Sequence, residues 1–94
     1  MLIHRNEELA AATAETILID RKRLRIYSDG TAKIYGKFNW VTGATEVSAT
    51  AFDFVIAIGG NDEWDFVDLG GNVGHISNVR LISSAVAELG ILAW

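Results

Sequence analysis

The sequence contains no cysteine and no proline among its 94 residues. Without cysteine the chain has no disulfide framework, no thiolate metal site and no thiol redox chemistry, so burial and hydrogen bonds alone must hold its fold. Its longest apolar run lies within residues 52–58 and is far shorter than the roughly 20 residues that cross a bilayer. The first ten residues also lack the order of charges and apolar residues that marks a signal peptide. We therefore expect a protein made in the cytoplasm without a signal peptide, whose final location the sequence leaves open.

The length and composition indicate one small domain, residues 1–94, with more apolar material than its core readily hides. Half of the residues are apolar and 21% are charged, whereas a chain of this length buries only about 60% of the surface that its unfolded form exposes. Twelve alanines account for part of this excess, because alanine costs little when exposed. The remainder predicts an oligomer or a stable protein partner.

The charges are distributed unevenly along the chain. Residues 1–40 hold seven of the eight Lys and Arg residues against five acids, and residues 41–94 hold Arg80 against seven acids. Such a division favours pairing of complementary charges, either between sheets of one subunit or between subunits. Ordinary solvated faces also explain it.

The pattern of apolar residues predicts an all-β fold, a small β-sandwich or barrel of six to seven short antiparallel strands. Residues 1–14 are predicted to form an arm or a short helix, since Asn6 and the acids after it resemble a helix start. The first strand is expected at Ile17–Ile19 and a long strand, or a pair with a bend near Ala51, over residues 46–58. Further strands are expected at 64–69, 76–83 and 85–94.

The clearest local pattern spans residues 23–40, where two alternating runs flank Ser28, Asp29 and Gly30. We predict a hairpin with a three-residue loop, which sets Leu24 opposite Ile34. One face of this hairpin would be basic and aromatic. Together with the chain end it is the predicted interface, comprising Arg23, Arg25, Tyr27, Lys33, Tyr35, Lys37 and Trp94. It suits an acidic protein surface, including one on another copy, better than nucleic acid, because the isoelectric point is near 4.9.

Residues that suit catalysis or metal binding occur without the spacing that such sites require. Ser77, His75 and Asp65 can be grouped as a triad, but no Gly-x-Ser-x-Gly turn presents the serine. The acids at 62, 63, 65 and 68 do not follow the order of a calcium loop. The glycine-rich residues 70–75 lack the context of a phosphate-binding loop. We expect no enzyme activity, no cofactor and no metal.

Three tryptophans are many for a chain of this length. Two are expected in the core. If Trp64 is exposed beside Asn61 and Asp62, it forms a possible ligand platform for sugar rings. Trp94 ends an apolar run, so we expect its segment to be held in its own sheet or in a partner.

No motif in the chain is specific to one family. In composition and layout, however, a short β domain without cysteine or proline and with an apolar C-terminus resembles small bacteriophage virion proteins. The resemblance implies a capsid decoration protein or a tail or fibre component, and it carries over no functional residue. The function expected is therefore that of a non-enzymatic structural protein that forms homo-oligomers or packs on a larger assembly. The alternative is a carbohydrate- or receptor-binding β module.

Overall fold

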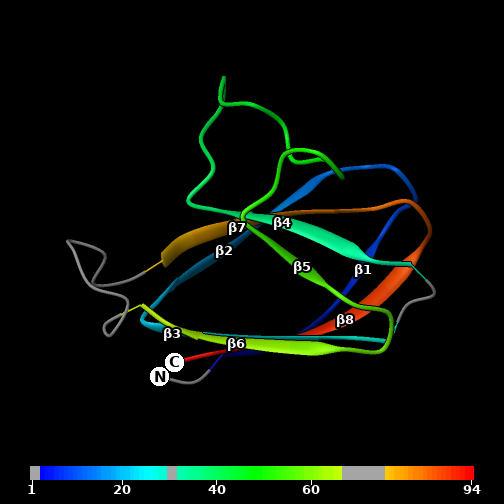
Figure 1. Ribbon diagram of the computed structural model, residues 1–94. Helices are drawn as coiled ribbons and strands as arrows, with labels where there is room; N and C mark the ends of the chain where they lie inside the picture. The colour runs from blue at the N-terminus through cyan, green and yellow to red at the C-terminus, as the bar shows by residue number, and fades with distance from the viewer. Residues whose placement is uncertain (1–2, 30–31, 67–75) are drawn as a thin grey trace.

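A computed structural model describes residues 3–29, 32–66 and 76–94. These residues form eight β-strands: β1 (Ile3–Leu9), β2 (Glu15–Arg21), β3 (Arg23–Ser28), β4 (Ile34–Phe38), β5 (Phe54–Ile56), β6 (Asn61–Asp65), β7 (Ile76–Ser83) and β8 (Ala87–Ala93). The strands make two four-stranded antiparallel sheets, with the order β1-β8-β3-β6 in sheet A and β2-β7-β4-β5 in sheet B. Figure 1 shows the two layers. The prediction of an all-β, sandwich-like fold is confirmed.

The core lies between the sheets because most strands alternate buried and exposed residues. Strand β3 buries Leu24 and Ile26, and β7 buries Val79 and Leu81, while their sequence neighbours point outward or lie at intermediate depth. This alternation places one face of each sheet in the core. No cysteine takes part, as the composition requires.

An aromatic cluster closes the end of the core where β4, β5 and β6 meet. The ring centroids of Phe38 and Phe54 are 4.7 Å apart, and Trp64 lies 4.6 Å from Phe54 and 5.3 Å from Phe38. Phe66 adds an edge contact to Phe38 at 5.1 Å. These contacts join sheet A to sheet B, and each such pair adds about 0.5–1.5 kcal/mol beyond the burial of its area.

Two parts of the predicted architecture are wrong. The described residues contain eight strands, not six or seven, and no helix. The predicted N-terminal helix or arm is instead β1, an edge strand whose backbone pairs with β8 from Ile3 opposite Ala93 to Leu9 opposite Ala87. The pattern at Asn6 that resembles a helix start is outweighed by the long-range pairing with β8. The backbone hydrogen bonds of this pairing satisfy every second residue of the segment, which itself has little helical periodicity.

The predicted hairpin over residues 23–40 is also wrong. Strand β3 pairs with β8 and β6 in sheet A, and β4 pairs with β5 and β7 in sheet B. The two strands thus lie in different layers, and Leu24 stands opposite Trp64 and Ala93 rather than Ile34. In both strands, the buried residues are nevertheless those that the alternating apolar pattern predicts. The period fixes which side chains face the core, but not which strand becomes the neighbour.

Other segments agree with the prediction to different degrees. Strand β7 has the predicted bounds, Ile17–Ile19 lies within β2, and the final segment is the strand β8. Between residues 46 and 58 only β5 is a strand, and a turn closed by the Ser48–Ala51 bridge provides the predicted bend. The predicted strand 64–69 overlaps β6, and its last residues lie outside the described ones.

Candidate functional site

The outer face of sheet A carries a ladder of opposite charges. On β3, Arg25 stands directly across from Glu63 of β6, and Arg23 stands across from Asp65. The Arg23 Nε atom donates a hydrogen bond of 2.9 Å to the Asp65 carboxylate. The arginines of the basic half of the chain thus meet acids of the other half within one sheet. Opposite charges in this position stabilise a strand pair by about 0.2–1 kcal/mol.

This topology divides the predicted interface. Arg23, Arg25 and Tyr27 lie on the outer face of sheet A, whereas Tyr35 and Lys37 lie on the outer face of sheet B. Lys33 is exposed just before β4. Trp94 is half-buried, and its backbone exchanges hydrogen bonds with that of Arg23. The seven residues do not form one surface, and the Trp94 segment is held in its own sheet, which is one of the two arrangements that the sequence left open.

Tyr27 covers the one glycine of β8. A Cβ atom at Gly90 would lie 2.0 Å from Cζ of Tyr27, so the ring rests directly on the glycine backbone. The Tyr27 hydroxyl lies 3.0 Å from Nε2 of His4 on β1. An aromatic ring over a strand glycine replaces the packing that the glycine lacks. Tyr27 therefore has a structural role across three strands.

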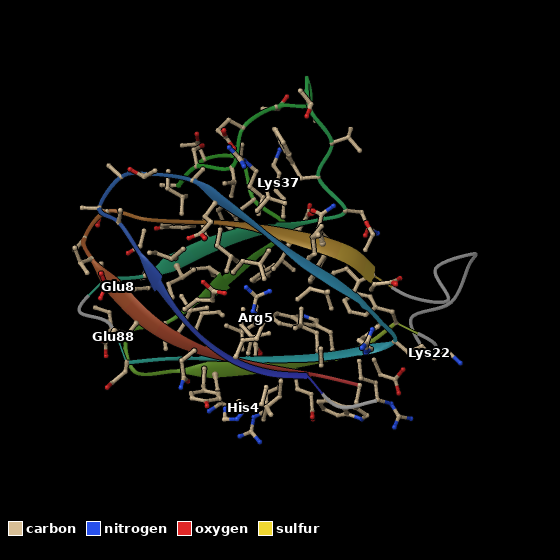
Figure 2. All side chains as sticks on the ribbon, turned by 180° about the vertical axis from the view of Figure 1, so that it is seen from behind. His4, Arg5, Glu8, Lys22, Lys37 and Glu88 are labelled. Carbon is tan, nitrogen blue, oxygen red and sulfur yellow. The ribbon has the colours of Figure 1, made fainter. Side chains whose placement is uncertain are left out.

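A hollow of about 430 Å³ lies beside Tyr27. Its lining comprises Asn6, Glu7, Glu8, Tyr27, Asp29, Glu88, Leu89 and Gly90. Glu8 and Glu88 stand directly opposite each other, and Figure 2 shows them together at one end of the molecule with Lys22 at the other. The hollow is strongly acidic, and among the described residues no group of three or more potential metal ligands is arranged to hold an ion.

The outer face of sheet B is covered in part by the loop between β4 and β5, residues 39–53, and Arg80 of β7 anchors that loop. The Arg80 guanidinium donates two hydrogen bonds to the Glu46 carboxylate, at 2.6 and 2.9 Å, and a third to the Thr16 hydroxyl at 2.6 Å. It also lies 4.2 Å from the centroid of the Trp40 ring. These hydrogen bonds lower the pKa of Glu46 below its ordinary value and raise the pKa of Arg80.

Further contacts hold the same loop against β7. The Asn78 side chain accepts a hydrogen bond from the Trp40 backbone N–H at 3.0 Å and donates one to the Trp40 carbonyl at 3.1 Å. Lys37 Nζ and the Trp40 indole N–H both donate to the Thr45 carbonyl, and Figure 2 shows Lys37 beside this loop. Lys37 is therefore engaged within the subunit, which is a role that the sequence did not indicate.

An apolar strip remains on the outer face of sheet B next to the loop. Val55 of β5 lies opposite Tyr35 of β4, and Tyr35 lies opposite Ile82 of β7, so the three side chains form one row. Phe52, 43% exposed, extends the row through a ring contact with Tyr35 at 5.2 Å. Val55 itself is 37% exposed. We call these four residues, Tyr35, Phe52, Val55 and Ile82, the β5 strip.

The residues of the predicted ligand platform lie on different faces. Trp64 faces the core, half-buried against Phe38 and Phe54, whereas Asn61 lies opposite Tyr27 on the outer face. Asp62 is exposed on the same row as Trp64. A separate hollow of about 320 Å³ lies near this edge, lined by Arg23, Glu63, Trp64, Asp65 and Trp94. Both Trp64 and Trp94 line this hollow.

Among the described groups considered for catalysis and metal binding, Ser77 and Asp65 have other hydrogen-bond partners, and Asp62 and Glu63 are exposed on β6. The Ser77 hydroxyl donates a hydrogen bond to the Asn39 side chain at 3.1 Å. His75, Asp68 and the glycine-rich residues 70–75 fall outside the described residues. No helix in the described part is long and apolar enough to span a membrane.

Two features of these surfaces had no clear sequence signal. Arg80 was notable only as the lone basic residue after position 40, and Val55 only as part of an apolar run. Comparisons with protein-family models and with curated proteins found no match to this chain. The case for a function therefore depends on the fold and on these surfaces.

Proposed function

We propose that this chain is a non-enzymatic assembly protein whose β domain associates with copies of itself. The observation that carries the proposal is the β5 strip, where Phe52 and Val55 lie exposed beside the half-buried side chains of Tyr35 and Ile82. Aromatic residues with few charges are typical of the centre of a protein interface. The excess of apolar residues in the composition also favours an interface with another protein.

The charged residues favour the β5 strip as the interface indirectly, because several basic residues already have partners within the subunit. The arginines of β3 face the acids of β6 within the subunit, and Arg80 and Lys37 are engaged with the loop over sheet B. This removes the main reason to expect a basic interface. The β5 strip, by contrast, leaves apolar side chains exposed beside that loop. As a setting for such an assembly we favour a virion, where the domain would serve as a capsid decoration protein or a tail or fibre component.

The test is the molar mass of the purified chain across a concentration series, measured by size-exclusion chromatography with light scattering. We expect a defined oligomer that weakens when Phe52 is replaced by Ser. Val41→Ser is the matched control, because Val41 is 65% exposed but lies on the loop outside the strip. A monomer at every concentration up to the millimolar range contradicts the proposal.

The hollow near Trp94 favours a second candidate function, a carbohydrate-binding module. Its lining combines the rings of Trp64 and Trp94 with the charged hydrogen-bonding groups of Arg23, Glu63 and Asp65, which is the combination that polar ligands need. Titration with a panel of oligosaccharides, followed by tryptophan fluorescence in the wild type and in Trp94→Phe, tests it. Binding that Trp94→Phe leaves unchanged, or no binding at all, contradicts this candidate.

A further inference from the structure

We draw no further inference here: the strongest candidate, the acidic hollow beside Tyr27 on the outer face of sheet A, is a cluster of carboxylates for which no second observation in the described part of the structure indicates a ligand.

Discussion

The outer faces of the two sheets satisfy their exposed groups in different ways. On sheet A, the arginines of β3 stand opposite the acids of β6, and Tyr27 lies over Gly90. On sheet B, Arg80 and its partners hold a loop over one part of the face, and the β5 strip beside that loop stays exposed. Sheet A therefore completes most of its cross-strand pairs within the subunit, while sheet B leaves an apolar area for a partner. Two arginines of the basic first half of the chain thus face acids of the second half within one subunit.

The largest effect is expected at a glycine that faces the core of sheet B. A Cβ atom at Gly36 would lie 2.1 Å from Cζ of Phe54, a buried ring of the aromatic cluster. Gly36→Ala should lower the free energy of unfolding by about 1–3 kcal/mol, because Phe54 has no space into which to move. Chemical denaturation followed by tryptophan fluorescence measures this loss. An unchanged midpoint would mean that the cluster is loosely packed.

The equivalent change on the outer face of sheet A should have a smaller effect. Gly90→Ala also collides with an aromatic ring, but Tyr27 is 36% exposed and can turn toward solvent. We expect a loss of about 1 kcal/mol, at the lower end of the range for overpacking, and loss of the Tyr27 contact with His4. Denaturation and the NMR signals of the His4 ring report the two effects. A loss of stability as large as that of Gly36→Ala would mean that overpacking costs the same at the inner and the outer position.

Reversal of one charge tests whether the ladder of sheet A acts within the subunit. Arg25→Glu sets two carboxylates opposite each other and should lower stability by about 0.2–1 kcal/mol. The double variant Arg25→Glu/Glu63→Arg restores the opposite charges and should recover most of this loss, with no change in molar mass. If Arg25→Glu instead reduces the molar mass and the double variant does not restore it, then Arg25 acts between subunits and the comparison fails.

The smallest effect concerns pH and the loop over sheet B. The pKa of Glu46 lies below its ordinary value of 4.5 because Arg80 hydrogen-bonds to the carboxylate. The resulting stabilisation is present above the ordinary pKa and is lost as the pH falls through the lowered one. We expect the indole N–H signal of Trp40 to shift over this acidic range as the loop loosens. Glu46→Gln should lack the transition, and an identical transition in that variant would assign it to another group.

The success of the sequence prediction differed between segments for a physical reason. Strand β7 was placed correctly because Ile76, Val79 and Leu81 mark it as a buried strand wherever it pairs. The N-terminal segment was misassigned because its polar residues Asn6–Glu8 carry no strand pattern, and only the ladder with β8 makes it a strand. Long-range pairing of this kind depends on closure of the intervening chain and on collective burial, which a local pattern does not report.

The prediction of the interface was limited in the same way, because a local pattern does not report long-range pairing. The basic character of Arg23 and Arg25 was visible in the sequence, but their partners Asp65 and Glu63 lie about forty residues away, and no local pattern pairs them. Conversely, Val55 was expected within a long strand, or a pair of strands, over residues 46–58. A bend at Asp53, whose carboxylate accepts a hydrogen bond from the Phe38 backbone, and the end of β5 at Ile56 leave this strand short and at the sheet edge.

The sequence by itself determined that the chain is an all-β domain without disulfides and, in strands with an alternating pattern such as β3, which residues face the core. Those properties follow from composition and from the two-residue period of a strand. Only the tertiary structure decided that β3 and β4 lie in different sheets, that the opposite charges meet within one subunit, and that β5 lies at an edge of sheet B. The physical reason is that alternation sets the face of each side chain, whereas the neighbour of each strand depends on how the whole chain buries its apolar surface.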